Sequence, residues 1–185
     1  MIFHTHRQTL LDLARTSISF GTKNRSRLSI DLNTFHPDIK QIGACFVTLT
    51  KQGALRGCIG SLQAHQPLVE NLVNNAYSSA LCDPRFPPVT EQEMNELTIH
   101  ISVLSPAEPL LFQSEKELLT LIQPGKDGLI LQQENHRGTF LPSVWETFPE
   151  PQLFLNQLKQ KTGLPASYWS NTIKVFRYTT DVVEE

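Results

Sequence analysis

The spacing of apolar residues changes twice within the first half of this chain. Between residues 5 and 20 the apolar positions fall near one helical stripe, which predicts a first helix with Gly21 just past its end. Residues 44–50 form a short apolar run that predicts a strand buried on both faces. Residues 97–104 alternate between apolar and other side chains, as a half-buried strand does.

Short turns join the strands that this pattern predicts. The turn at 51–53 predicts that a strand over 54–62 returns antiparallel beside 44–50, as a hairpin at the centre of the sheet. Pro67 then opens a helix with an apolar stripe and an amide-rich face, which either meets solvent or borders a cleft. A long polar loop is expected over 22–41, and a rigid proline-rich loop over 83–88.

The second half of the chain predicts further helices and strands in alternation. Capping boxes predict helices after Thr90 and Ser114, and prolines open two more at Pro142 and Pro151. A hairpin is expected from 129–131 and 138–141, and a last strand over 172–178 is followed by an acidic tail. The class is therefore α+β, with a mostly antiparallel central sheet flanked by helices.

Composition describes an ordinary globular chain. Of its 185 residues, 39% are hydrophobic and 18% charged, and the net charge of −2 gives no bulk attraction to nucleic acid or membrane. A short basic segment at 23–27 is the one local exception, and it is typical of a solvated loop. No apolar run is long enough for a membrane span. Three cysteines without framework spacing indicate reduced thiols and a cytoplasmic location.

Residues 54–62 are the strongest candidate in the sequence for a catalytic or ligand-binding site. It reads as a strand with glycines at 57 and 60, and glycine in a strand marks a bulge or a close approach of backbone or ligand. Alternation puts Arg56, Cys58 and Gly60 on one face. We therefore expect a cleft near residues 54–62, with Gly57 and Gly60 as ligand-binding positions.

Cys58 has two interpretations, as a catalytic nucleophile or as a small half-buried strand residue. A nucleophile needs a base, and His65, His100 and His136 are candidates that the sequence does not place beside the thiol. Arg56 could lower the pKa of that thiol.

Arg56 and Arg85 could together hold an anionic group. The alternative for Arg85 is an internal ion pair with Asp83 or Glu70. Asp83 is included among the ligand-binding candidates because it shares the rigid loop with Arg85.

No cofactor or metal is predicted. His4 and His6 are terminal, and no histidine or cysteine spacing matches a zinc or iron–sulfur pattern. The glycines at 57 and 60 do not form a nucleotide-binding fingerprint, and an aromatic platform for RNA is not apparent.

Five motifs in order resemble the AMMECR domain family, named after a human chromosomal region. They cover roughly residues 8–178 and read LRGCIG at 55–60, DPRFPP at 83–88, ISVLSP at 101–106, PGKDG at 124–128 and GTFLPSVW at 138–145. The resemblance implies one cytoplasmic α+β domain over 1–185, with a larger and a smaller lobe. It also implies an AmmeMemoRadiSam setting, with a Memo-like protein and a radical SAM enzyme as partners.

These observations leave three candidate functions for the protein. The first is an accessory module that binds a small anionic ligand, a peptide or a partner protein at the LRGCIG strand. The second is a cysteine- or acid/base-dependent modification enzyme that uses Cys58. The third, a nucleic-acid binder using residues 23–27, is disfavoured by the net charge of −2. The sequence leaves open whether the protein is an enzyme.

Overall fold

The computed structural model describes residues 5–185, which form two compact units. Unit 1 runs to Leu104 and also includes Asp181–Glu185, and unit 2 is Ser105–Thr180. Each unit has its own four-stranded sheet. The pairings β1–β2 and β1–β3 in unit 1, and β4–β7, β5–β7 and β5–β6 in unit 2, are antiparallel. The α+β class predicted from the sequence is confirmed, although the strands form two sheets rather than one.

The sheet of unit 1 has the order β2-β1-β3-β8. Its strands are β1 (Cys45–Lys51), β2 (Ala54–Gly60), β3 (Leu97–Leu104) and β8 (Thr180–Glu184). The predicted hairpin forms, because Gln52 and Gly53 both adopt the positive φ values, 53° and 79°, of a tight two-residue turn. Its predicted place at the centre was wrong, since β2 lies at the edge of the sheet.

Strand β8 corrects the prediction of an acidic tail. The segment lies beside β3, and the backbone N–H of Glu185 donates to the carbonyl of Ile99 at 3.2 Å. Arg15 also donates to the Glu185 carboxylate, at 2.6 Å and 2.7 Å from the same nitrogen. The acidic residues at the end of the chain therefore led to a predicted tail, whereas contacts with β3 and Arg15 hold this segment as a strand.

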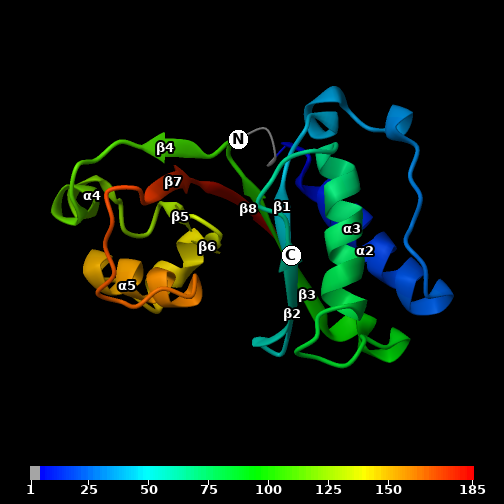
Figure 1. Ribbon diagram of the computed structural model, residues 1–185. Helices are drawn as coiled ribbons and strands as arrows, with labels where there is room; N and C mark the ends of the chain where they lie inside the picture. The colour runs from blue at the N-terminus through cyan, green and yellow to red at the C-terminus, as the bar shows by residue number, and fades with distance from the viewer. Residues whose placement is uncertain (1–4) are drawn as a thin grey trace. The chain divides into compact units, whose positions relative to one another are not determined.

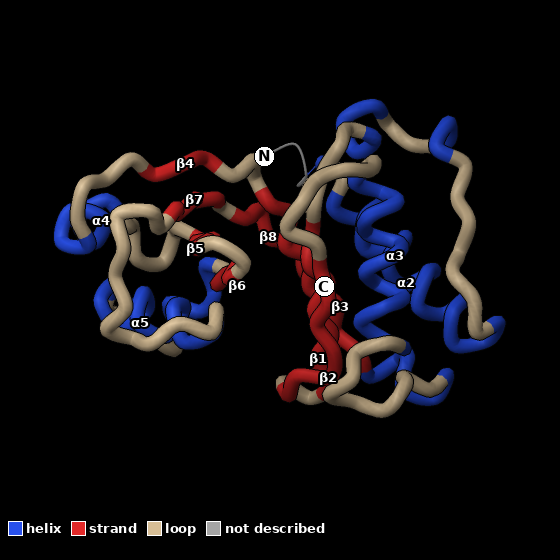
Figure 2. Tube along the Cα trace, viewed as in Figure 1, coloured by secondary structure: helices blue, strands red, loops and turns tan. Residues whose placement is uncertain are grey.

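Helices α2 (Arg7–Asn24) and α3 (Leu68–Leu81) cover the same face of this sheet (Figures 1 and 2). The predicted end of the first helix at Gly21 was wrong, because the helix continues to Asn24 and ends at Arg25 with φ of 52°. A Cβ at Gly21 would lie 2.7 Å from the Tyr77 ring of α3. This glycine therefore lets two helices pack closely instead of ending one of them.

The two faces of the sheet differ in burial. Side chains from alternate positions of β1 and β3 pack under the helices, and they are Cys45, Val47, Leu49, Ile99, Ile101 and Val103. The opposite face carries Phe46, Thr48, Thr50 and His100, which are only half-buried. The expectation that residues 44–50 are buried on both faces was therefore wrong.

Two connections in unit 1 shape the site described below. The predicted loop 22–41 contains two short 3-10 helices, η1 (Leu32–Thr34) and η2 (Pro37–Lys40). The proline-rich loop after α3 forms as predicted and leads into a third, η3 (Glu91–Glu96). At its start, the Glu93 carboxylate accepts the backbone N–H of Thr90 at 3.0 Å.

Unit 2 has the sheet order β4-β7-β5-β6 and a core of its own. Its elements are β4 (Glu108–Leu110), α4 (Glu115–Leu121), β5 (Gly128–Gln133), β6 (His136–Phe140), η4 (Pro142–Glu146), α5 (Pro151–Lys161) and β7 (Lys174–Tyr178). The Trp145 ring stacks on Phe154 with centroids 3.8 Å apart, and both side chains are buried. The sequence predicted these elements apart from β4, because its three residues are too few to show the alternation of apolar and polar side chains that marks a strand.

Candidate functional site

Strand β2 carries the LRGCIG motif along an edge that other side chains cover. The backbone N–H of Cys58 donates to Asp83 Oδ2 at 2.9 Å, and its carbonyl accepts from Arg85 Nη2 at 3.1 Å. Both groups point away from β1, so Asp83 and Arg85 bond β2 where a further strand would pair. This arrangement protects an exposed sheet edge and fixes the position of Cys58.

Ser79 of α3 reaches between β1 and β2. Its hydroxyl accepts the N–H of Ile59 at 2.8 Å and donates to the carbonyl of Val47 at 2.7 Å. Val47 and Ile59 face each other in the register of the two strands. The hydroxyl thus links two groups of the ladder, and it brings the backbone of α3 against β2.

Asn71 and Asn75 continue this polar stripe along α3 at helical spacing. Asn71 Oδ1 accepts the N–H of Cys45 at 3.0 Å, and Asn75 Nδ2 donates to the carbonyl of Cys45 at 3.0 Å. Both amides are buried. The prediction that the amide-rich face meets solvent or a cleft was therefore wrong for Asn71 and Asn75, whereas Asn74 of the same face is half-buried. The i, i+4, i+8 spacing of Asn71, Asn75 and Ser79 was the signal that reasoning from sequence missed.

Protein atoms fill the space that the two glycines of β2 leave. A Cβ at Gly57 would lie 2.1 Å from the carbonyl oxygen of Ser79. A Cβ at Gly60 would lie 2.2 Å from the ring of Phe46, its partner on β1. The close approach expected from the sequence is real, and the groups that approach are a helix backbone and an aromatic ring.

Each arginine of the predicted site is held by a carboxylate. Arg56 Nε and Nη2 donate to the two oxygens of Glu93 at 3.0 Å and 3.1 Å, and Nη1 donates to the carbonyl of Pro87. Hydrogen bonding from Arg56 lowers the pKa of Glu93 to about 2. Arg85 donates to both oxygens of buried Asp83, and these bonds hold the pKa of Asp83 well below its usual range.

These ion pairs bear on the alternatives that the sequence left open. The internal pair of Arg85 with Asp83 is present, whereas the partner of Arg56 is Glu93, which the sequence did not suggest. The Arg85 side chain still keeps 53% of its surface exposed, and that of Arg56 keeps 12%. Joint binding of an anion by Arg56 and Arg85 stays a prediction, and so does the role of Asp83 as a ligand-binding residue. An anion would have to compete with Glu93 and Asp83 for the two guanidinium groups.

The Cys58 thiol has a hydroxyl beside it. Thr48 Oγ1 donates to Cys58 Sγ at 3.2 Å, and these two residues pair across β1 and β2. His100 pairs with Thr48 from the other side, on β3, so Cys58 and His100 flank one threonine on the half-buried face. His100 Nδ1 lies 3.1 Å from Glu184 Oε2, and Nε2 lies 3.4 Å from Thr50 Oγ1.

The other candidate bases have partners elsewhere. His65 is exposed and bonds the carbonyl of Gln63, while His136 belongs to unit 2 and bonds the carbonyl of Thr162. Among the histidines within residues 5–185, none forms a hydrogen bond with the Cys58 thiol. Of the three candidates, His100 alone shares a cross-strand row with Cys58.

We predict that Cys82, and not Cys58, reacts first with an alkylating reagent at neutral pH. Cys82 is exposed, Cys58 is half-buried, and complete burial raises the pKa of Cys45 to about 12. Mass spectrometry of peptides after timed iodoacetamide treatment would give the order Cys82, Cys58, Cys45. Repeating the reaction on Cys82→Ser isolates Cys58, and alkylation of Cys58 faster than a free thiol would contradict the prediction.

Comparison with known proteins identifies the chain. The family model AMMECR1 matches residues 11–183. The chain belongs to the AMMECR1 family. A protein of Methanothermobacter thermautotrophicus is 38% identical over 184 residues, which cover 96% of this chain and 93% of the relative. Protein PH0010 of Pyrococcus horikoshii is 37% identical over 183 residues, or 95% of this chain and 88% of the relative.

A solved structure shares the AMMECR1 fold described here. The crystal structure of uncharacterized protein PH0010 from Pyrococcus horikoshii matches with a TM-score of 0.87 and 35% identity, covering 96% of this chain and 90% of that one. The expected family is therefore confirmed. Within residues 5–185 of this AMMECR1 protein, no helix has both the length and the apolar character that crossing a bilayer requires.

Proposed function

We propose that this AMMECR1 protein is an accessory module that binds a protein partner through the LRGCIG strand. The observation that carries the proposal is the way β2 is fixed. Its Cys58 backbone is bonded by Asp83 and Arg85, and Ser79 joins it to β1. A strand held in this way is pre-organised, and a pre-organised surface loses little conformational entropy when a partner binds.

The surroundings of Cys58 favour binding over nucleophilic chemistry. The thiol accepts a hydrogen bond from Thr48, and no imidazole among the described residues contacts it. Arg56 is engaged by Glu93 and Pro87, so its guanidinium has partners other than the thiol. An adjacent base is one of the ways in which a protein activates a cysteine nucleophile, and the histidines within residues 5–185 do not supply it here.

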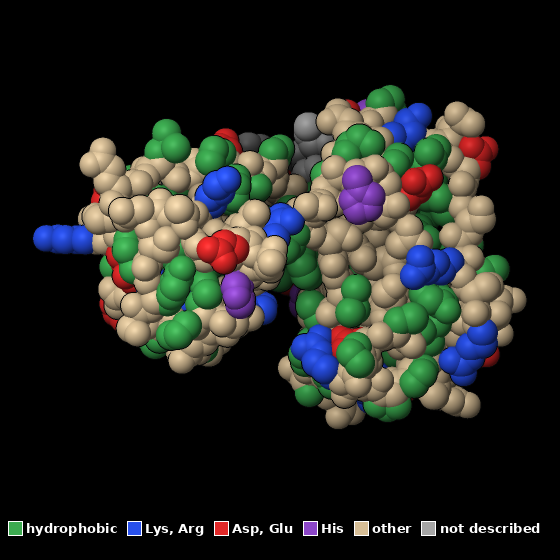
Figure 3. Space-filling view, in the orientation of Figure 1, with side chains coloured by type: hydrophobic (Ala, Val, Ile, Leu, Met, Phe, Trp, Pro, Cys, Tyr) green, Lys and Arg blue, Asp and Glu red, His purple; other side chains and the backbone are tan. Residues whose placement is uncertain are grey.

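The partner that we propose is a Memo-like protein or a radical SAM enzyme from the same genome. This choice rests on the family resemblance of the motifs. Leu55, within the motif, is 45% exposed and offers an apolar contact at the edge of the sheet. Lys and Arg side chains on the face seen in Figure 3 are scattered among other side chains, so this face offers no continuous basic surface for nucleic acid.

A second candidate is acid/base chemistry on the half-buried face, with His100 as the base. The specific observation in its favour is that Glu184 lies 3.1 Å from His100 Nδ1, since a carboxylate in this position orients an imidazole. For Cys58 to take part, its thiol and His100 would have to interact across Thr48. Loss of a measured activity in both Cys58→Ala and His100→Gln would favour this candidate over binding.

Calorimetry with purified proteins tests the proposal. Wild type is expected to bind a Memo-like protein or a radical SAM enzyme, and Leu55→Asp to weaken binding at least about tenfold, because a charge is desolvated at the contact. Leu111→Asp is the matched control, since Leu111 is an exposed leucine of unit 2. Absence of binding by wild type, or equal binding by wild type and Leu55→Asp, would overturn the proposal.

A further inference from the structure

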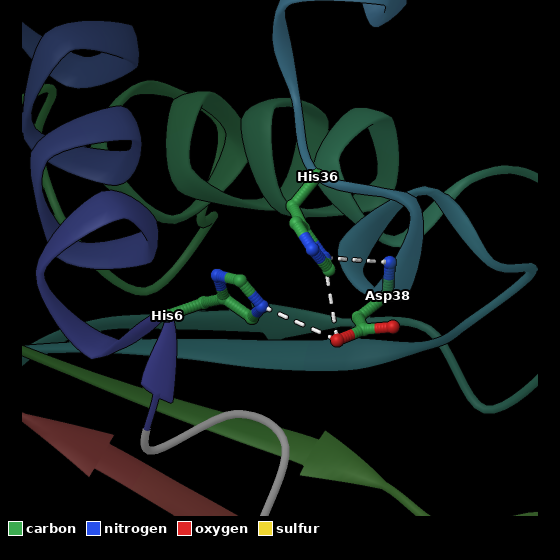
Figure 4. A group of neighbouring side chains, drawn as sticks. All are labelled: His6, His36 and Asp38. Carbon is green, nitrogen blue, oxygen red and sulfur yellow. Dashed lines mark hydrogen bonds and ion pairs between the residues drawn. The ribbon is translucent and has the colours of Figure 1, made fainter.

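Three potential metal ligands, His6, His36 and Asp38, meet in unit 1 (Figure 4). His6 directly precedes α2, whereas His36 and Asp38 belong to the start of η2, about 30 residues later in the chain. The carboxylate oxygen Asp38 Oδ2 lies 3.5 Å from His6 Nε2 and 3.3 Å from His36 Nδ1. The two imidazole rings lie with centroids 4.8 Å apart and planes tilted by 32°.

The present contacts of His36 Nδ1 and Asp38 leave this nitrogen unprotonated. His36 Nδ1 accepts the backbone N–H of Asp38 at 3.3 Å, a long hydrogen bond that engages the one lone pair of this nitrogen. The Asp38 carboxylate lies on the same side of that nitrogen. A metal ion bound here would replace the N–H as the partner of that lone pair and would share the carboxylate.

The distances between the donor atoms fit a small divalent cation. Zinc bonds of 2.0–2.1 Å in tetrahedral geometry place neighbouring ligand atoms about 3.3 Å apart. The two distances from Asp38 Oδ2 are 3.3 Å and 3.5 Å, and all three donor atoms lie within 4.8 Å of one another. Closing the longest separation requires a shift of about 1.5 Å, and His36 is the most exposed of the three side chains.

The donor set indicates the kind of ion. Two imidazoles and one carboxylate suit divalent zinc, cobalt, nickel or iron better than calcium or magnesium, which prefer oxygen ligands. The side chains of His36 and Asp38 keep 57% and 37% of their surface exposed, while His6 keeps 15%. Three protein ligands beside solvent leave at least one coordination position for water.

We propose that His6, His36 and Asp38 form a site for a divalent transition-metal ion such as Zn²⁺. The ion joins the beginning of α2 to η2 and so fixes the connection between the first helix and β1. The sequence predicted no metal because residues 6 and 36 follow no known ligand spacing, and folding alone brings them together. His4, named with His6 in that prediction, lies outside the described residues.

Titration of the full, untagged chain with Co²⁺ tests the site, because tetrahedral Co²⁺ absorbs visible light strongly and aqueous Co²⁺ does so weakly. Wild type is expected to develop this absorption with one equivalent of ion. His36→Ala and Asp38→Asn are expected to bind at least about tenfold more weakly, since even outer-shell changes cost 10–100-fold. Excess Zn²⁺ is expected to displace Co²⁺ and bleach the band.

Two histidine controls separate this site from adventitious binding. His65→Ala removes an exposed histidine that contacts only the carbonyl of Gln63, and His4→Ala removes the remaining terminal histidine. Both are expected to titrate as wild type does. The proposal is overturned if wild type gives no band, or if His36→Ala and Asp38→Asn retain wild-type affinity. Far-UV circular dichroism of each variant verifies that a lost band does not reflect unfolding.

Discussion

Gly57→Ala is expected to lower the free energy of unfolding by about 3 kcal/mol, at the upper end of the range for overpacking a core. The added methyl group would lie 2.1 Å from the carbonyl oxygen of Ser79, which belongs to the backbone of α3. A backbone atom cannot rotate aside as a side chain can. Helix α3 must therefore move, which disturbs the bonds from Ser79 to Val47 and Ile59.

Gly138→Ala is the matched control for this substitution. Gly138 also lies in a strand, β6, without a left-handed φ. Its Cβ would lie 3.2 Å from the Thr162 side chain and 3.5 Å, an ordinary van der Waals distance, from the Thr162 Cα. We expect a change of less than about 1 kcal/mol there. Equal losses in the two variants would show that α3 does not approach β2 as described.

Urea unfolding followed by far-UV circular dichroism measures both variants. Tryptophan fluorescence alone is unsuitable, because Trp145 and Trp169 both belong to unit 2 and Gly57 lies in unit 1. Hydrogen exchange adds a local measurement. The amides of β1 and β2 are expected to lose protection in Gly57→Ala and to keep it in Gly138→Ala.

Asp83→Asn is expected to cost about 2–3 kcal/mol at neutral pH, because a buried charge-assisted network is broken. The Asp83 carboxylate accepts from the N–H groups of Cys58 and Arg85 and from the Arg85 guanidinium. An asparagine can accept with its one oxygen, but its amide nitrogen then faces the guanidinium. Because the Arg85 side chain keeps 53% of its surface exposed, water compensates part of the loss.

The cost of Asp83→Asn should depend on pH in a defined direction. The pKa of Asp83 is held well below its usual range in the folded state, chiefly by hydrogen bonding from Arg85. Its contribution to stability is therefore fully present above the unfolded-state pKa of about 3.9 and is lost as the pH falls below that value. Wild type and Asp83→Asn should differ most above pH 5 or so and converge in strong acid.

Urea unfolding of both proteins at several pH values measures this convergence. Asp12→Asn is the control, since Asp12 is an exposed carboxylate whose hydrogen-bond partner is Gln8. Its stability is expected to stay within about 0.5 kcal/mol of wild type. A difference between wild type and Asp83→Asn that is constant over pH would mean that the carboxylate is not paired with Arg85 as described.

Local signals in the sequence were sufficient for most of the secondary structure. The alternation over 97–104 matches β3 (Leu97–Leu104), and the capping serine Ser114 accepts the N–H of Glu117 at the start of α4. Proline at the first position opens α5 (Pro151–Lys161), and Gly163 with φ of 86° follows its end. Each of these features depends on residues within one or two turns of the chain, so a short window contains the necessary information.

Features that depend on distant partners were misjudged. The amides of Asn71 and Asn75 are polar, and yet they are buried because Cys45 supplies backbone partners. The acidic last residues form β8 because β3 offers a free side. Hydrophobic periodicity describes burial only while polar groups stay in water, and a polar group with a complementary partner can be buried without cost to the fold.

The sequence by itself determined the family, the α+β class and the strand that carries Arg56 and Cys58. Tertiary structure alone decided that Glu93 holds Arg56, that Asp83 and Arg85 bond the backbone of Cys58, and that His6 meets His36 and Asp38. The reason is physical. Strand and helix periods follow from local backbone geometry, whereas ion pairs and ligand clusters depend on which segments folding brings within a few ångströms of each other.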